Sequence, residues 1–342
     1  MSQITRDNHF VPQLYLKQWS EDGNWIWVYR ILVSHKNVPM WNLRPIRGVA
    51  SHRDLYTTLS NGSEIDEFER WIESEYEQPA QEAIEKVIHN KPLTSIDWER
   101  LALFLAAQDV RTPTSYLESM ERWENTLPDL LQNTLNNAVQ LLKQSATHKM
   151  PPVPDENHTS SFFQKAVQVE IMPGNNPSGK IIRAEMVAGR ALWLESQRFL
   201  LTKTAQALLK HKWSIAEPAD GIEWFTSDHP VVRLNYYGDA KYDLKGGWGN
   251  PGTDLIMPLS PHHLLFTEIG AEAPDHFTFS HEKTIWIQQF QAERALRWIY
   301  ASKPMKNVLE YRPRHVDSDV FKAEQEQLRK WHEEQSQNDA ER

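Results

Sequence analysis

The chain has no cysteine, no long apolar run and none of the common catalytic or nucleotide-binding motifs, and each absence excludes something. Without cysteine, neither disulfides nor thiolate metal sites can form. No apolar run is long enough to cross a bilayer, and the first residues, MSQITRDNHF, lack the apolar region of a secretory signal peptide. Walker and Rossmann glycine motifs, HExxH and GxSxG are absent as well. These features predict a cytoplasmic protein that does not enter a membrane.

The charge balance restricts the partners further. The net charge is −9, which disfavours broad binding to a nucleic-acid backbone because that binding depends on Lys and Arg. A small basic cleft, or a site that meets phosphates through a metal, stays compatible with this charge. Hydrophobic residues make up 40% of the chain and include 14 tryptophans, so a sizeable core is expected.

The order of segments predicts an α+β fold, because helical and strand-like patterns are mixed without regular βαβ alternation. We expect a mostly helical N-terminal half packed against a mixed or antiparallel sheet. That sheet would be formed largely by residues 213–270 plus strands near 24–58. Periodicity also indicates long helices over 64–89, 95–111 and 180–212, and a last core helix over 285–302.

The domain organisation follows from the same patterns. Residues 1–312 are expected to form a single α+β domain, with the helical region 95–212 as a candidate subdomain. Residues 313–342 are charged and predict a helix that ends in a tail. This helix is a candidate surface for a partner protein or a second copy of the chain.

The strongest local signal for a site is WFTSDHPVV, residues 224–232. A strand ends there in Ser227, Asp228 and His229, and side chains at strand ends are held rigidly and can point into a cleft. Asp228 and His229 could ligate a metal or act as an acid–base pair. The alternative is a simple turn, which Asp and Pro commonly form.

A second signal lies on the predicted helix 95–111. Gln108 and Arg111 continue the apolar stripe of Leu101, Phe104 and Leu105. A buried guanidinium must pair with a carboxylate or meet an anionic ligand, so Arg111 indicates either an internal ion pair or an anion site.

A third signal is acidic. Glu69, Glu73 and Glu77 are spaced by four and would share one helix face, which is typical of a solvated surface and less often of a metal site. Asp228 followed by Asp243-Leu-Lys245 also matches the short acidic template of metal-dependent nucleases, a pattern that arises easily by chance.

Several segments together resemble the DUF4238 family of bacterial proteins of unknown function. NHFVPQLYLKQW resembles its opening H-[YF]-[VI]-P-Q-x-[YL]-L motif, FLAAQDVRTP its Q-x-x-R-x-P segment and WFTSDHPVV its F-x-T-S-D-x-P motif, and IMPLSPHHLL and ERALRWIYAS resemble its closing segments. The resemblance spans about residues 8–303. It implies a shared residue set of His9, Gln108, Arg111, Ser227 and Asp228. His229 stands where the family often has Asn.

The combined observations predict a metal-assisted hydrolase for phosphodiester or nucleotide substrates, acting as a nuclease-like effector in antiviral defence. Asp228 and His9 would bind a divalent ion such as Mg²⁺ or Mn²⁺ or perform acid–base chemistry. Arg111 would hold an anionic group, and Gln108, Ser227 and His229 would orient the small-molecule or nucleic-acid substrate. The alternative is a non-catalytic binding or sensor protein in which the same residues form a structural polar core.

Overall fold

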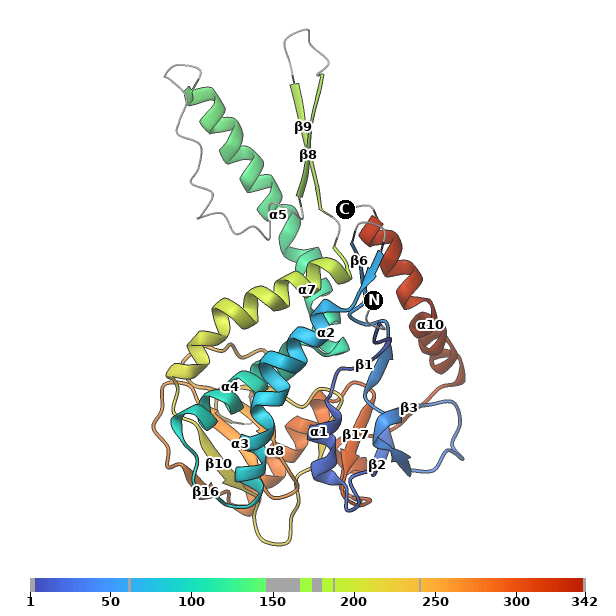
Figure 1. Cartoon of the computed structure of the whole chain (residues 1–342), viewed down its shortest axis with the longest axis vertical. Coiled ribbons are helices and arrows are strands. Elements are labelled where there is room, and N and C mark those ends of the chain that lie inside the picture. Colours follow the sequence, from blue (N-terminus) through green and yellow to red (C-terminus); the bar gives the residue numbers. More distant parts are fainter. Residues whose placement is uncertain are drawn as a thin grey trace.

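The described part of the computed structural model has short strands and helical turns up to residue 65, consecutive helices from Glu67 to Ser145, and mixed strands and helices after residue 166 (Figure 1). The structure describes residues 4–60, 63–145, 167–173, 180–186, 188–239 and 241–340. The fold is α+β, but the expected mostly helical N-terminal half is wrong. Short strands fill much of the first 65 residues, and further helices follow residue 190. Many of these elements are short, so a periodicity window as long as a helix covers more than one of them.

The first part of the chain combines short strands with tight helical turns. Its elements are β1 (Asp7–His9), α1 (Gln13–Leu16), η1 (Lys17–Trp19), β2 (Trp25–Arg30), β3 (Leu32–Val33), β4 (Trp41–Pro45), η2 (Ile46–Gly48), β5 (Ser51–Arg53), β6 (Thr58–Ser60) and β7 (Ser63–Ile65). Pro12 precedes α1 with extended backbone, which suits the start of a helix. Strand β1 pairs antiparallel with β5, which fixes the backbone of Asn8 and His9 at the start of the NHFVPQ segment.

A helical layer follows, formed by α2 (Glu67–Ile72), the π-helical turn η3 (Glu73–Glu77), α3 (Gln78–Ile88), α4 (Ser95–Val110) and α5 (Pro113–Ser145). Thr94 and Asp97 form a capping box that starts α4. The Nζ of Lys86 on α3 lies 2.9 Å from Oδ1 of Asp97, which joins α3 to α4. Two of the helices expected from periodicity are therefore present, with the first one interrupted by a π-turn.

The larger sheet has six strands in the order β13-β12-β14-β15-β10-β16. Its strands are β10 (Ser214–Glu217), β12 (Val232–Tyr236), β13 (Tyr242–Asp243), β14 (Thr253–Pro258), β15 (Leu264–Glu268) and β16 (His276–Thr278). The pairings are antiparallel except that of β10 with β16, so the predicted mixed sheet over 213–270 is present.

The N-terminal strands do not join this sheet, which corrects the expectation of one sheet. Strands β2 and β4 belong to a separate four-stranded sheet with β11 (Thr226–Ser227) and β17 (Trp298–Ala301), in the order β11-β17-β2-β4. The chain therefore passes from the larger sheet at β10 to the smaller one at β11, and back at β12. The segment between β11 and β12 holds Asp228 and His229, so the motif lies where the two sheets meet.

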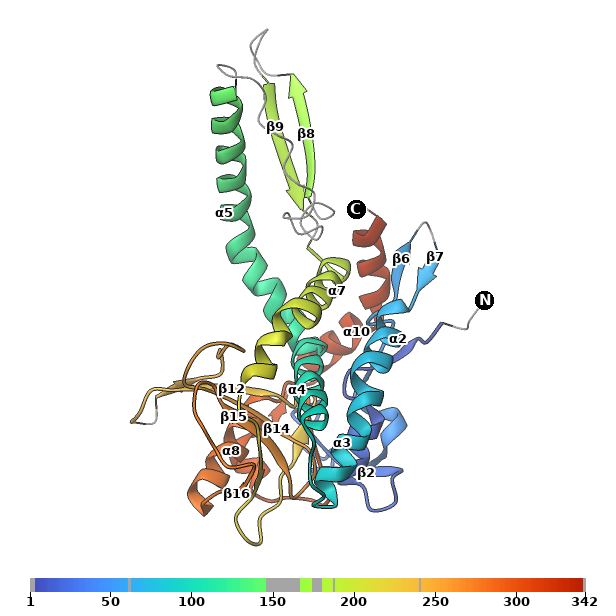
Figure 2. The ribbon, with the colours of Figure 1, turned by 60° about the vertical axis from the view of Figure 1, so that its left-hand side comes forward.

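Two predicted helices are wrong in part. Residues Lys180–Met186 form β9, which pairs with β8 (Val167–Pro173), and the helical stretch comprises only α7 (Arg190–Phe199), η4 (Leu200–Thr204) and η5 (Ala205–Lys210). The last core helix, α8 (His281–Arg294), ends before β17. In both segments, apolar residues fit a strand as well as a helix, and pairing with a neighbour decides between them. Figure 2 shows β8, β9 and α5 extending from the body in the same direction.

The C-terminal part contains α9 (Val308–Tyr311), β18 (His315–Val316) and α10 (Ser318–Ala340). Helix α10 packs beside β6 and α7 (Figures 1 and 2). One cluster of buried apolar side chains runs from Phe10 to Tyr300 and joins the N-terminal segment, the helical layer and the larger sheet. Within the described ranges, no helix is both long enough and apolar enough to span a membrane.

Candidate functional site

The two central motif segments meet in the fold. The QDVRTP segment covers the end of α4 and the turn into α5, and the TSDHP segment covers β11 and the turn into β12. The side chains of Thr112 and His229 form a hydrogen bond between them. The opening motif joins the same region, because the guanidinium of Arg111 donates to the backbone carbonyl of His9.

Arg111 is part of an internal ion pair. Its side chain is 1% exposed, and its guanidinium pairs with the carboxylate of Glu77. The Nε of Arg111 also lies 3.4 Å from the hydroxyl of Tyr56, which donates to the carbonyl of Arg111 at 2.6 Å. Burial opposes the charge, but the carboxylate of Glu77 and the oxygen of Tyr56 outweigh it and raise the pKa of Arg111. Of the two readings of Arg111, the geometry supports the internal pair.

The row of glutamates does not form one solvated face. Glu73 is exposed, whereas Glu77 is buried against Arg111. The π-turn at Glu73–Glu77 adds a residue to the helical repeat, so the spacing of four no longer keeps these side chains in line. Burial, together with the charges of Glu77 and Glu73, raises the pKa of Glu69 to about 7, although Arg111 opposes this. The solvated-face interpretation is therefore wrong for Glu77.

Asp228 fixes the backbone of a neighbouring loop. Its Oδ1 accepts the amide of Leu296 at 2.9 Å, and its Oδ2 accepts the amides of Arg297 at 2.7 Å and Trp298 at 3.2 Å. Burial raises the pKa of Asp228 to about 6, although these amides oppose the shift. These hydrogen bonds fix the turn that leads from α8 into β17, so the carboxylate of Asp228 has a structural role.

Ser227 has a similar local role. Its Oγ donates to the carbonyl of His229 at 2.8 Å and accepts the amide of His229 at 3.1 Å. These bonds shape the turn between β11 and β12. The turn interpretation of TSDHP thus accounts for Ser227 and Asp228, but it does not account for the ring of His229.

His9 and Gln108 both lie near Arg111, and their metal and substrate roles stay predictions. His9 meets Arg111 through its backbone, and burial lowers the pKa of its ring. Gln108 is fully buried, and in the part of the chain that the structure describes its amide atoms have no hydrogen-bond partner. Among the described residues, no group of three or more His, Asp or Glu side chains is arranged to hold a metal. The structure thus gives no support to a metal bound by His9 and Asp228.

Asp228 and Asp243, the two carboxylates of the nuclease-like pattern, bind different parts of the fold. The carboxylate of Asp243 accepts the side-chain amide of Asn235 at 2.9 Å and the hydroxyl of Tyr237 at 2.7 Å. These bonds hold it at the β12–β13 edge of the larger sheet, whereas Asp228 is committed to the amides before β17. The two carboxylates serve separate local structures.

Asp109 is the residue that the sequence reasoning missed. Its Oδ2 accepts the indole N–H of Trp248 at 2.8 Å and lies 3.5 Å from Nη1 of Arg233. Its Oδ1 is buried without a hydrogen-bond partner among the described residues, 3.8 Å from the equally unpartnered Nε2 of His229. Burial lowers the pKa of His229 well below its usual value, and the charges of Arg294 and Arg233 lower it further. A carboxylate therefore faces a neutral imidazole.

Asp109 lines a cleft, and His229 contacts Asp109 without lining the cavities. Asp109 lines a cavity of about 180 Å³ with Glu118, Arg122, Arg233 and Trp248. Glu118, Arg122 and Arg233 also line an outer cavity of about 860 Å³, which Arg294 and Lys245 border. Glu118 accepts from Arg233 at 3.4 Å and also pairs with Arg294. The inner cavity is thus lined by two guanidinium groups, of Arg122 and Arg233, and by two carboxylates, of Asp109 and Glu118.

The sequence did contain a signal for this site. Asp109 stands within the same QDVR segment as Gln108 and Arg111, and an acid on a buried helix needs a polar partner just as Arg111 does. Arg233 follows His229 by four residues on the next strand. Their convergence depends on the meeting of α4 with β12, which no local pattern encodes.

The family described as a protein of unknown function, DUF4238, matches residues 7–304. The chain belongs to the DUF4238 family. The match covers both motif segments that converge at Asp109 and His229, and it ends before α10. No curated protein and no solved structure matches the chain. Membership of DUF4238 therefore supplies no reaction, and the chemistry has to be argued from the cleft.

Proposed function

We propose that the cleft of Asp109 and His229 is the active site of a hydrolase that acts on phosphate esters. The observation that carries this proposal is the pair of unpartnered buried atoms, Oδ1 of Asp109 and Nε2 of His229, 3.8 Å apart beside a cleft that Arg122 and Arg233 line. Leaving buried polar atoms unsatisfied is costly, and such atoms beside a cleft are candidates for catalysis.

Two arginines of the cleft can bind an anionic group of a substrate. Arg122 and Arg233 line both the inner and the outer cavity, and guanidinium groups bind phosphate oxygens in a bidentate manner. Arg122 forms no ion pair with any described residue, so its charge is available to a ligand. Arg233 is shared between Asp109 and Glu118 at 3.5 and 3.4 Å, distances that leave room for a closer anion.

The chemistry at the inner end is general acid–base catalysis. Asp109, oriented by Trp248, would accept a proton from the water that attacks phosphorus as the P–O ester bond breaks. The leaving alkoxide would take its proton from solvent water, and Asp109 would then release its own proton to solvent. His229, held by Thr112, is a positioning residue for this carboxylate. Its contact with Asp109 is long, as contacts of catalytic groups often are until substrate binds. We also propose that the phosphate ester binds as a complex with Mg²⁺ or Mn²⁺.

The test compares Asp109→Asn with the wild type on p-nitrophenyl phosphate and bis(p-nitrophenyl) phosphate, with and without added Mg²⁺ and Mn²⁺. We expect the variant to lose activity by about 100-fold or more, the usual contribution of a general base. Glu124→Gln is the matched control, because Glu124 lies on α5 and lines neither cavity. Equal turnover by Asp109→Asn and wild type, with the variant folded, would overturn the proposal. An effector role in antiviral defence extends the same proposal and depends on this activity.

A second candidate is a non-catalytic binding or sensor protein. It is favoured by the internal bonds of Arg111, Ser227 and Asp228, which show that much of the family motif is structural. In that case, titration with inorganic phosphate would show binding that Arg233→Gln weakens, while neither ester is hydrolysed under any metal condition.

A further inference from the structure

A second pocket lies on one face of the four-stranded sheet and shares no lining residue with the cleft. Its volume is about 350 Å³, within the range of small-molecule sites. Alternate residues of a strand point to the same face, so Val28 and Arg30 of β2 lie beside Asn42 and Arg44 of β4. Trp298 and Tyr300 of β17 continue this face on the other side, with Trp298 opposite Arg30 and Tyr300 opposite Val28.

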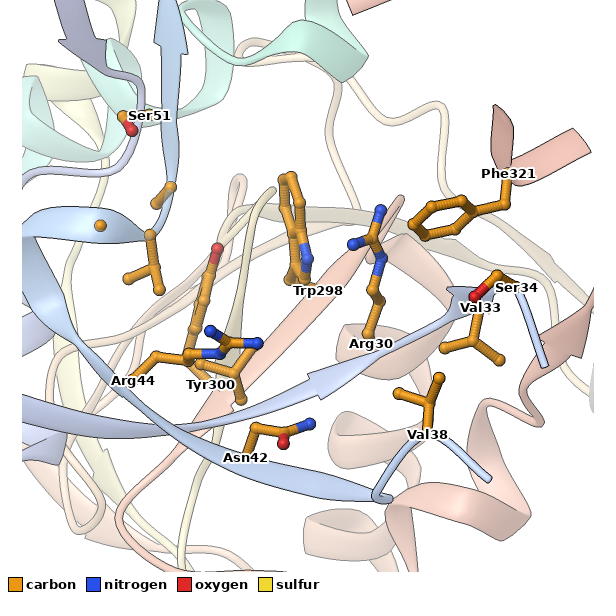
Figure 3. A pocket seen from close by; sticks show the side chains of 14 residues that line it. Arg30, Val33, Ser34, Val38, Asn42, Arg44, Ser51, Trp298, Tyr300 and Phe321 are labelled. Atoms are coloured by element: carbon orange, nitrogen blue, oxygen red, sulfur yellow. The ribbon is translucent and has the colours of Figure 1, made fainter. Parts of the chain in front are cut away.

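The pocket combines aromatic walls with a fixed guanidinium. Figure 3 shows Arg30 between the rings of Trp298 and Phe321, and Arg44 close to Tyr300. The Cζ of Arg30 lies 4.4 Å from the centre of the Phe321 ring and 5.8 Å from that of Trp298. This stacking orients the guanidinium and leaves its edge toward the pocket. Phe321 comes from α10, so the C-terminal helix closes a site whose other walls belong to the family region.

Positive charge in this pocket is not balanced by the protein. Glu324 is shared by Arg297, at 2.7 Å, and by Arg30, at 3.5 Å. The contact of Arg30 with Glu324 is made by its buried Nη2 and is long, and Arg44 has no ion pair in the described ranges. Burial lowers the pKa of Arg30, and Arg297 and Arg44 lower it further although Glu324 opposes them. Two guanidinium groups therefore share one carboxylate, and the guanidinium of Arg44 has no carboxylate partner among the described residues.

Tyr300 adds an unused donor. Its side chain is fully buried and lines the pocket, and its oxygen lies next to the backbone amide of Ala50, whereas its O–H has no acceptor among the described residues. Buried donors are nearly always paired, so a free O–H beside a pocket points to a ligand atom. The adjoining side-chain amide of Asn42 can donate to the same atom.

We propose that this pocket binds a small anion that carries a flat aromatic ring, such as an aromatic carboxylate. The anionic group would lie between Arg30 and Arg44, and the ring would rest on Val28 beside Trp298 and Tyr300. This arrangement pairs the surplus charge, satisfies the hydroxyl of Tyr300 and covers apolar surface. The ligand class contains no phosphate ester, so its binding is independent of hydrolysis in the cleft.

The test is calorimetric titration of the full-length protein with indole-3-acetate, indole-3-acetamide and acetate. We expect indole-3-acetate to bind at least about tenfold more tightly than either of the others, because only it supplies both the charge and the ring. Arg44→Gln should weaken indole-3-acetate by about tenfold or more, since it removes a charge-assisted contact. Tyr300→Phe, which keeps the ring, should weaken it by about three- to tenfold.

The matched control is Arg47→Gln. Arg47 is exposed, follows Arg44 by three residues and does not line the pocket, so its loss removes the same charge without touching the ligand. Its affinity for indole-3-acetate should stay within about twofold of the wild type. The proposal is overturned if indole-3-acetate binds with a Kd weaker than about 1 mM, if the amide binds equally well, or if Arg44→Gln binds like the wild type.

Discussion

Glu69 lies beside the Arg111–Glu77 pair and titrates in the neutral range, where its proton affects stability. One of its carboxylate oxygens is buried without a hydrogen-bond partner in the described part of the chain, and burial raises its pKa to about 7 from an ordinary value of 4.5. Between about pH 4.5 and 7, the folded protein therefore holds a proton that the unfolded chain releases. Its stability then falls as the pH rises through this window, because folding disfavours the charged carboxylate.

We predict that Glu69→Gln removes this part of the pH dependence. The amide cannot ionise, so the wild type should lose stability relative to the variant as the pH rises from about 4.5 to 7. Urea denaturation of both proteins at several pH values measures this difference. Glu75→Gln, at an exposed position further along the same helical segment and not among the charges that shift Glu69, is the control for the change of residue type. A difference that stays constant across the window would show that Glu69 is charged throughout.

At the scale of elements, the pairing of Arg111 with Glu77 joins the π-turn η3 to the end of α4. We predict that Arg111→Met destabilises the protein by about 3–5 kcal/mol, because it leaves the buried carboxylate of Glu77 without its partner. The double variant with Glu77→Met should recover most of this loss, since two apolar side chains replace the pair. Guanidinium chloride denaturation measures both values.

Arg100→Met is the control for this prediction. Arg100 faces Glu82 at 3.4 Å on the exposed side of α4 and α3, and surface pairs contribute about 0–1 kcal/mol. If Arg111→Met lowers the free energy of unfolding no more than Arg100→Met does, the guanidinium of Arg111 does not stabilise the fold. Its availability for an anionic ligand would then have to be reconsidered.

At the scale of the whole molecule, α10 packs against β3, β6 and α7, which belong to the region that the family model matches. Trp331 packs edge-on against Tyr116, with ring centres 4.7 Å apart, and against His52 at 5.3 Å. The side-chain oxygen of Gln335 accepts the backbone amide of Arg190 at 2.7 Å at the start of α7. The helix proposed as a surface for partners thus uses one side for contacts within its own chain.

We predict that Trp331→Ala lowers the free energy of unfolding by about 1–3 kcal/mol, because the partly buried ring loses its contacts with α5 and β5. Lys330→Ala is the control, since Lys330 is exposed and pairs only with Glu326 on the same helix at 3.2 Å. Thermal unfolding of both variants gives the comparison. Equal melting temperatures would mean that α10 does not contribute to the stability of the body.

The sequence predicted the helical parts that depend on local pattern. The capping residues and apolar stripe of α4 lie within one segment, and so do the short apolar runs of β10, β12 and β15. The wrong predictions concern segments whose pattern fits two structures, namely 180–186, which pairs with β8, and the segment after α8, which pairs with β2 far away in the chain. Local sequence gives no measure of such pairing, because its energy comes from residues far apart in the chain.

By itself, the sequence determined membership of DUF4238, the α+β class and the need of Arg111 for an anionic partner, because these depend on residue type and spacing. Only the tertiary structure decided that this partner is Glu77, and it did so through a π-turn that shifts the helical register. It also decided that Asp228 binds backbone amides while Asp109 faces His229. Both choices depend on which elements pack together, and packing is set by the whole core rather than by any one segment.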